Sequence, residues 1–178
     1  TSYEARSRRS ESIQIGLNIS DLGKAMFAAE KWLALAKQDG EALAQEESEN
    51  QQRALLASVG LGPEDKVPAQ LKSELKALAD DQKRRQTRAI RDGLDRILLD
   101  LASAYRDIAT IQLQAGLDLV NESLRDQLEM RARASKVEST MIVLDEIKLA
   151  RRRIERNVRD LLAMESLATK MIFRGWGN

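Results

Sequence analysis

The sequence contains no cysteine and no histidine among its 178 residues. Their absence excludes cysteine nucleophiles, histidine general bases, disulfides and nearly all zinc sites. Carboxylate, lysine and hydroxyl side chains remain, but no pair of them forms a recognisable catalytic motif. The sequence therefore predicts a chain without a catalytic site, a bound cofactor or a metal.

Proline, glycine and aromatic residues are also scarce, with two prolines, nine glycines and 3% aromatics. Alanine, leucine, glutamate, lysine, arginine and glutamine are abundant instead, and these residues lose little side-chain freedom in a helix. Apolar residues make up 43% of the chain and charged residues 32%, enough for one sizeable domain or two small helical modules. The composition predicts an all-α fold.

Long apolar runs and an excess of one charge are missing as well. No segment approaches the roughly 20 apolar residues that span a bilayer, and the start, from Thr1 to Arg6, is too charged for a signal peptide. The net charge of +1 gives no strong overall attraction to nucleic acid or to an anionic membrane. We therefore expect a soluble, cytoplasmic protein with no membrane partner. Because the first residue is not methionine, we also expect a fragment of a longer chain.

Near the start of the chain, apolar residues alternate strictly with polar residues or glycine, at Ile13, Ile15, Leu17 and Ile19. A period of two is typical of extended chain, and no second segment of this kind exists to pair with it as a strand. The pattern predicts an extended linker over residues 13–19. We accordingly expect residues 1–19 to be the end of a preceding module and a linker, and residues 20–178 to form the main domain.

A long helix is predicted over residues 20–59. It begins at Ser20-Asp21, whose short side chains can accept hydrogen bonds from the N–H groups of the first turn. Apolar and small residues then follow from Leu22 at steps of four and three, a heptad seam suited to packing against another helix. Gly60, followed closely by proline, ends the helix.

A second long helix is predicted over residues 68–114, with Pro68 in the first turn and Gly116 just beyond its end. Its charged stretch Asp80–Arg88 would face the polar stretch Gln45–Gln52 if the two long helices ran antiparallel. Both helices would then be apolar at the tip, polar in the middle and apolar at the base. This agreement favours a long helical hairpin.

Shorter helices are predicted after the hairpin. Asn121 can cap a helix over Glu122–Ala132, and Ser135–Glu138 has the pattern of a capping box that opens the next helix. Asn157 breaks or restarts that helix, and an amphipathic pattern continues to Met171. The whole is predicted to be an all-α bundle of about five helices with one long antiparallel hairpin.

Five basic residues in the second long helix form the first candidate binding segment: Lys83, Arg84, Arg85, Arg88 and Arg91. Clustered cations of this kind can bind a phosphate backbone. Aspartates stand four residues before or after most of them, which is the usual arrangement of a solvated helix face. We favour the solvated face and keep direct nucleic-acid contact as an alternative.

The run Arg151–Arg153 forms a second basic cluster, near a predicted helix end where cations are favoured by the dipole. It is compatible with an interface or with a solvated end. Trp32 and Tyr105 are most simply core residues, although exposed aromatics would be good anchors for a partner. For Trp176 we expect a loosely docked or disordered tail.

Three segments of the chain resemble one known family. KRRQTRAIRDGLDRILLDLASAYRDIATIQLQAG, from Lys83, and DEIKLARRRIERNVRDLLAMESLATKM, from Asp145, are similar to the C-terminal collar domain of actinobacterial-type delta-prime subunits of the bacterial DNA polymerase III clamp loader. Tyr105-Arg106-Asp107 resembles the Trp/Tyr-Arg-Asp helix of clamp-loader collars, and the helix after Asn157 resembles their final helix. Residues 5–43 resemble the passage from the preceding lid module into the collar.

The resemblance implies a fold and a role that the spacing of residues does not show. It implies a clamp-loader C-terminal-domain-like helical bundle that assembles with the delta and gamma/tau subunits. Association with the sliding clamp and primed DNA would be indirect, in support of DNA replication. The delta-prime subunit is the stator and has no ATPase activity of its own, so the resemblance implies a scaffold and not an enzyme. The long hairpin departs from the shorter loops of other bacterial collars.

Two other classes of function remain open from the residues alone. One is a helical nucleic-acid-binding module that uses Lys83–Arg91, with Lys83, Arg84 and Arg85 as the contacts. The other is a self-associating coiled-coil scaffold. The candidate interface residues with partner proteins are Trp32, Arg88, Arg91, Tyr105, Arg106, Arg152 and Arg153.

Overall fold

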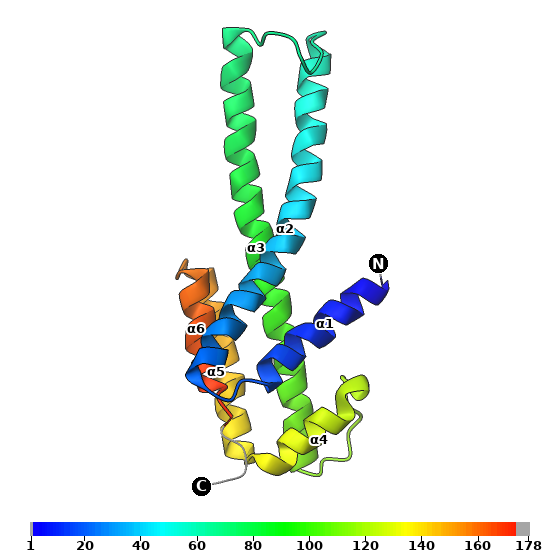
Figure 1. Ribbon diagram of the computed structural model, residues 1–178, viewed down its shortest axis with the longest axis vertical. Helices are drawn as coiled ribbons and strands as arrows, with labels where there is room; N and C mark the ends of the chain where they lie inside the picture. Colours follow the sequence, from blue (N-terminus) through cyan, green and yellow to red (C-terminus); the bar gives the residue numbers. More distant parts are fainter. Residues whose placement is uncertain (1, 174–178) are drawn as a thin grey trace. The chain divides into compact units, whose positions relative to one another are not determined.

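The computed structural model describes residues 2–173, and for residues 2, 39, 42 and 43 it describes the backbone alone. Within this range the secondary structure is helical throughout, with turns and loops between helices and no strand (Figure 1). The all-α prediction is confirmed. None of the described helices is long and apolar enough to cross a membrane.

The described residues form six α-helices and one 3-10 helix, where the sequence predicted about five helices. The two longest helices, α2 and α3, have 37 and 44 residues, and a group of shorter helices follows them. The helices are α1 (Ser2–Leu17), α2 (Leu22–Ser58), α3 (Ala69–Gln112), η1 (Glu122–Leu124), α4 (Arg125–Ala134), α5 (Val137–Glu155) and α6 (Asp160–Lys170).

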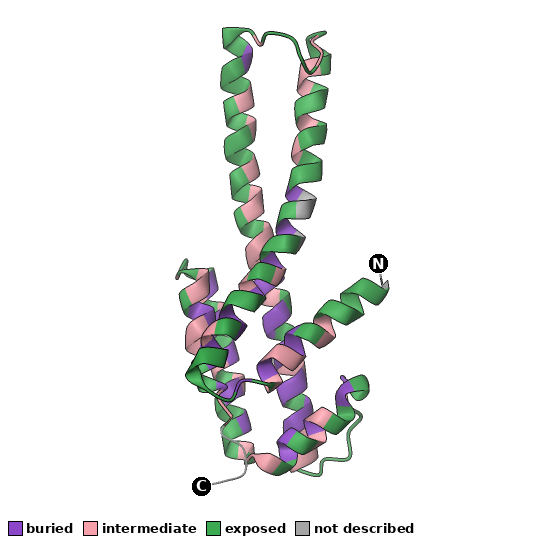
Figure 2. Ribbon diagram, in the orientation of Figure 1, coloured by how far each residue is buried: buried purple, intermediate pink, exposed green. Residues whose placement is uncertain are grey.

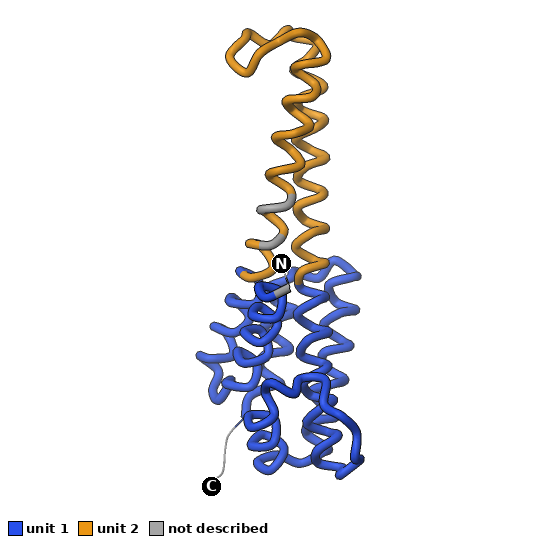
Figure 3. Tube along the Cα trace, turned by 90° about the vertical axis from the view of Figure 1, so that its right-hand side faces the viewer, with its two compact units in different colours: residues 1–34, 94–178 blue, residues 35–93 orange. Residues whose placement is uncertain are grey.

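The chain divides into two compact units, coloured blue and orange in Figure 3. Unit 1 comprises residues 1–34 and 94–178, and unit 2 comprises residues 35–93. The helices α2 and α3 each contribute residues to both units.

The prediction of an extended linker over residues 13–19 is wrong, because α1 continues to Leu17. Ile13 and Ile19 are buried in unit 1, and Gly16 between them is buried as well. A Cβ at Gly16 would lie 2.8 Å from Leu101 Cδ2, so glycine is what lets α1 approach α3 so closely. The end of α1 is packed on more than one side, so its apolar residues point in more than one direction. A helix packed in this way can show a period of two in its sequence.

The ends of α2 agree with the sequence prediction. Asp21 Oδ1 accepts a hydrogen bond from the Lys24 backbone N–H at 2.8 Å and caps the first turn. At the other end Gly60 has φ +73°, and the Leu61 N–H donates to the Leu56 carbonyl. This pattern is a Schellman motif, in which a left-handed residue satisfies the last carbonyls of the helix.

Two other helices end in the same way but at residues other than glycine. Gln114 has φ +51° and terminates α3, two residues before the predicted stop at Gly116. Asn157 has φ +62° and terminates α5, where the Val158 N–H donates to the Arg153 carbonyl. Asn157 is therefore a helix stop.

The two predicted N-caps in the second half of the chain do not form, because both side chains have other partners. Asn121 precedes η1 but directs its amide to Asp107 Oδ2 at 2.9 Å. Ser135 Oγ donates to the Arg131 carbonyl at 2.7 Å, and the N-cap of α5 is Lys136, without a side-chain hydrogen bond. The tertiary contacts of these residues outweigh their local capping propensity.

Unit 1 has an apolar core, and most of the buried residues, drawn as purple ribbon in Figure 2, belong to this unit. Trp32 is completely buried, and its indole Nε1 donates to the Ser12 carbonyl at 3.1 Å. The other large, fully buried side chains come from α1, α3, α4, α5, α6 and the segments that follow α1 and α6. They are Ile13, Ile19, Leu94, Leu98, Leu101, Ile108, Leu128, Ile147, Met164, Leu167 and Met171.

Unit 2 consists of the second part of α2, the first part of α3 and the loop between them (Figures 1 and 3). Glycine permits close contact of the two segments at one end of the unit, where a Cβ at Gly93 would lie 3.1 Å from Ala36. Farther along, Gln86 Nε2 donates to Glu41 Oε1 at 3.4 Å. The polar stretches of the two segments thus face one another within unit 2.

Candidate functional site

The basic segment of α3 lies in unit 2 and does not form one continuous cationic surface. Lys83 and Arg84 are exposed, and Arg84 lies 3.9 Å from Asp81 Oδ1. Arg85 is half-buried and turned toward α2, where it donates to Glu47 Oε1 at 3.0 Å and to a glutamine oxygen. Arg85 therefore joins the two helices of unit 2.

The next two basic residues of this segment differ in exposure. Arg88 is exposed and Arg91 is half-buried. Asp92 is exposed beside them, so charges of both signs alternate along this face. Of this basic segment, Lys83, Arg84 and Arg88 are the cations that are exposed to a partner.

Trp32 and Tyr105 are core residues of unit 1, exposed by 0% and 2% of their surfaces. The Tyr105 hydroxyl accepts a hydrogen bond from Arg131 Nη2 at 3.4 Å. Burial raises the pKa of the Tyr105 hydroxyl, and the neighbouring Arg131 opposes this effect. Neither aromatic ring is available as an anchor on the surface of the described chain.

Arg106 is exposed between two buried neighbours, Tyr105 and Asp107. The Asp107 carboxylate accepts hydrogen bonds from the backbone N–H groups of Val120 at 3.0 Å and Asn121 at 2.8 Å. With the Asn121 amide it has three donors, and it fixes the loop between α3 and η1. Tyr105 and Asp107 therefore stabilise the fold, whereas Arg106 between them faces solvent.

The Asp107 cluster continues to α1 through Arg9. Arg9 Nη2 donates to Ser103 Oγ at 3.0 Å, and its Nε donates to Asn121 Oδ1 and lies 3.5 Å from Asp100 Oδ1. Burial raises the pKa of the Asp100 carboxyl, while Arg9 and Arg96 lower it. This network links α1, α3 and the loop before η1. Nothing in the sequence pattern around Arg9, Asp100 or Ser103 predicts it.

The three arginines of the run 151–153 have three different environments. Arg151 binds the Asp95 carboxylate with two hydrogen bonds, at 2.6 and 3.1 Å, and so joins α5 to α3. The Asp95 hydrogen bond raises the pKa of Arg151. Arg153 donates to Ser166 Oγ at 2.8 Å and joins α5 to α6, whereas Arg152 is exposed. Of this run, Arg152 is the residue best placed to meet a partner.

Large apolar side chains are exposed along two helices of unit 1. Leu99 of α3 is 48% exposed, and Leu113, just beyond the end of α3 with its N–H still bonded to the Ala109 carbonyl, is 63% exposed. Exposed Arg106 lies midway between them in sequence. Residues seven apart lie on the same side of a helix, so these three form one stripe. On α5, Ile142 and Leu149 have the same spacing and are 56% and 36% exposed. We call these five residues the exposed stripes.

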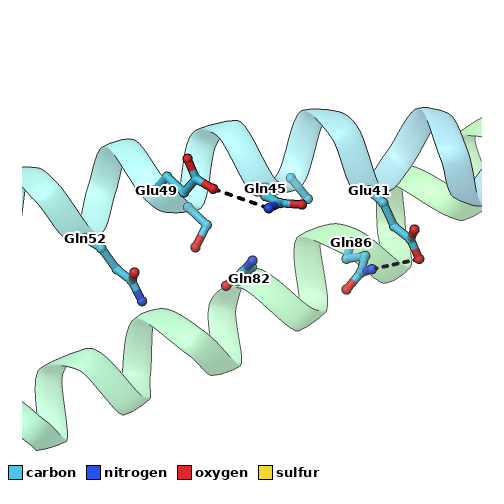
Figure 4. A pocket seen from close by; sticks show the side chains of 8 residues that line it. Glu41, Gln45, Glu49, Gln52, Gln82 and Gln86 are labelled. Atoms are coloured by element: carbon cyan, nitrogen blue, oxygen red, sulfur yellow. Dashed lines mark hydrogen bonds between the residues drawn. The ribbon is translucent and has the colours of Figure 1, made fainter.

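A polar cavity of about 350 Å³ lies between the two helices of unit 2 (Figure 4). Amide and carboxylate side chains surround it, and the Gln45 amide donates to Glu49 Oε1 at 3.3 Å. No group of three or more acidic side chains in the described chain is placed to hold a metal ion. The cavity gives unit 2 a hydrophilic middle, with two carboxylates, Glu41 and Glu49, among its lining residues.

The last site residue considered in the sequence, Trp176, lies outside the described residues. The remaining candidates are not gathered into one site, because Lys83, Arg88 and Arg91 belong to unit 2 while Arg106 and Arg152 belong to unit 1. Comparison of the chain with models of known protein families, with curated proteins and with solved structures finds no match.

Proposed function

We propose that this chain is a non-catalytic assembly module that binds other proteins through the exposed stripes of unit 1. The observation that carries the proposal is the exposure of Leu99, Leu113, Ile142 and Leu149 at helical spacing along α3, the turn that follows it, and α5. Scattered exposed apolar residues are ordinary, but rows of them along a helix suit the docking of another helix.

The more specific form of the proposal is a collar domain of a clamp-loader delta-prime subunit. The segments that resemble this family, 83–116 and 145–171, include all of α6 and much of α3 and α5. Four of the five stripe residues fall in these segments. Partners would be the delta and gamma/tau subunits, and clamp and primed DNA would be reached through them.

Within this proposal the candidate interface residues have two kinds of role. Arg106 and Arg152 are exposed on the helices that carry the stripes and would contact a partner directly. Arginine is among the residues that contribute most to interfaces, since its planar head group can bind carboxylates in two places. Trp32 and Tyr105 would act only by holding the helices in position.

The proposal is tested by mixing the protein with the partner collar domains at tens of micromolar and measuring the molar mass by light scattering. We expect a heteromer, and we expect Leu99→Lys with Ile142→Lys to weaken it at least tenfold, because lysine would be desolvated on an apolar contact. Val59→Lys is the matched control, because Val59 is 50% exposed in unit 2.

Two results would count against the proposal. If the molar mass of the mixture never exceeds that of its separate components, the clamp-loader subunits are excluded as partners. A stable homodimer of the chain alone, across a concentration series and sensitive to the stripe substitutions, would replace them with a self-associating scaffold.

A nucleic-acid-binding module is the second candidate, and the exposure of Lys83, Arg84 and Arg88 favours it. Binding to primed DNA would then weaken steeply with salt, because each phosphate contact releases counterions. Arg84→Glu with Arg88→Glu would reduce the affinity, whereas Arg106→Glu in unit 1 would leave it unchanged. Undetectable or salt-independent binding would exclude this function.

A further inference from the structure

A second cavity, of about 440 Å³, lies in unit 1 where α4 ends, α5 begins and α6 ends. Three basic residues line it, Arg131, Lys136 and Lys170, and no acidic residue does. Neither lysine has a carboxylate within ion-pair distance in the described chain. The cavity is therefore strongly positive in a molecule that is nearly neutral overall.

Arg131 is the unusual member of this group, because its side chain is buried and only 8% of the residue is exposed. Its guanidinium donates hydrogen bonds at 3.2–3.4 Å to three neutral oxygens, which are the Leu17 and Met171 carbonyls and the Tyr105 hydroxyl. The Phe173 ring centre lies 3.9 Å from the guanidinium carbon. Burial lowers the pKa of Arg131. A buried cation without a carboxylate is costly, and an anion in the adjoining cavity would offset that cost.

The cavity also contains the N-terminal end of α5, a helix of 19 residues. Its N-cap, Lys136, provides no side-chain acceptor, so the backbone N–H groups of the first turn remain available. Ser139 lies in this turn, lines the cavity, and has a hydroxyl without a hydrogen bond to the described chain. Such a helix end attracts anions through its N–H groups and its dipole.

We propose that this cavity binds a small organic phosphate. Lys136 and Lys170 would neutralise the phosphate together with Arg131, and the α5 N–H groups and Ser139 would donate hydrogen bonds to its oxygens. Val143, Ile172 and Phe173 form apolar wall, and a cavity of this volume accommodates a carbon body beside the charged group. The inference concerns a different site from the exposed stripes and does not depend on the proposed function.

The test uses the full chain, with phenyl phosphate as the probe and phenol as the uncharged comparison. Titrations at about 150 mM salt are followed by amide chemical shifts and by calorimetry. We expect saturable binding of phenyl phosphate, weaker binding of inorganic phosphate, and none of phenol. The shifts should centre on residues 137–140.

Charge reversal locates the site. Lys136→Glu and Lys170→Glu should each weaken phenyl phosphate binding at least tenfold, and the milder Lys136→Gln should weaken it several-fold, with helicity unchanged by circular dichroism. Lys148→Glu is the control, since Lys148 is an exposed residue of α5 outside the cavity. The proposal would be overturned if all of these variants bound phenyl phosphate within twofold of the affinity of the unmodified protein. It would also be overturned if binding did not saturate at millimolar phenyl phosphate.

Discussion

Arg106 and Asp107 are adjacent in sequence and have opposite roles in the structure. We expect Asp107→Ala to reduce the free energy of unfolding by about 3 kcal/mol, because two backbone N–H groups and an amide would lose a buried, charged acceptor. We expect Arg106→Ala to change it by less than about 0.5 kcal/mol, as for most exposed residues. Chemical denaturation followed by circular dichroism measures both.

These two variants also separate stability from binding. Under the proposed function Arg106→Ala weakens assembly with a partner while the fold is kept. Equal stability losses for the two variants would show that Asp107 does not have the structural role assigned to it.

At the scale of single residues, the sequence predicts apolar burial better than polar burial. Trp32 and Tyr105 are placed in the core because they stand at helical spacing among other apolar residues. Asp107 and Arg131 are not recognised, because their partners lie elsewhere in the chain, at Asn121 for one and at Met171 for the other. A lone charged residue carries no local sign of such a contact.

The first element, α1, provides a test at the scale of helices. Gly16→Ala would gain about 1 kcal/mol of helix propensity, but the new Cβ would lie 2.8 Å from Leu101 Cδ2 and 2.9 Å from Met171 Cε. Overpacking of a core costs about 1–3 kcal/mol, so we expect a net loss of about 1 kcal/mol in the free energy of unfolding. Thermal and chemical denaturation check this.

The control for this prediction is Ser7→Ala, which adds no bulk at an exposed position of α1. If residues 13–19 were an extended linker, as their alternating pattern predicts, Gly16→Ala would be neutral or slightly stabilising through the unfolded chain. A stabilised variant would therefore contradict the packing of α1 described above.

The polar middle of unit 2 leads to a second prediction at this scale. Ser48 and Gln82 are half-buried and line the cavity between the helices. We expect Ser48→Leu with Gln82→Leu to stabilise the protein by about 1–3 kcal/mol, because apolar contacts would fill a gap between polar side chains. A rise in melting temperature would show it, and Ser73→Leu on an exposed face would not reproduce it.

The long helices were predicted to within two residues at each end because their signals are local. Capping by Asp21 and the glycine at position 60 depend only on neighbouring residues. The end of α1 and the caps at Asn121 and Ser135 were wrong, because contacts distant in sequence decide them. The exposed stripes were not predicted either, since Leu99 and Ile142 have the same spacing as core residues.

For the whole molecule, burial along α3 predicts uneven stability. No side chain between residues 72 and 92 is buried, whereas buried side chains recur from residue 94 to 109. Backbone amides open more easily where few apolar contacts hold a helix. We expect amide hydrogens of residues 72–92 to exchange at least tenfold faster than those of residues 94–109, measured by mass spectrometry or NMR at one pH. Uniform exchange along α3 would contradict this prediction.

The contact of Gly16 with Met171 has a consequence for synthesis. A ribosome adds about 5–20 residues per second, so the roughly 155 residues between these positions take on the order of 10–30 s to make. During that time α1 has emerged from the tunnel but lacks Met171, which follows α6 and packs against it. The nascent chain therefore exposes the apolar end of α1, residues 13–17, until the residues that cover it have been made.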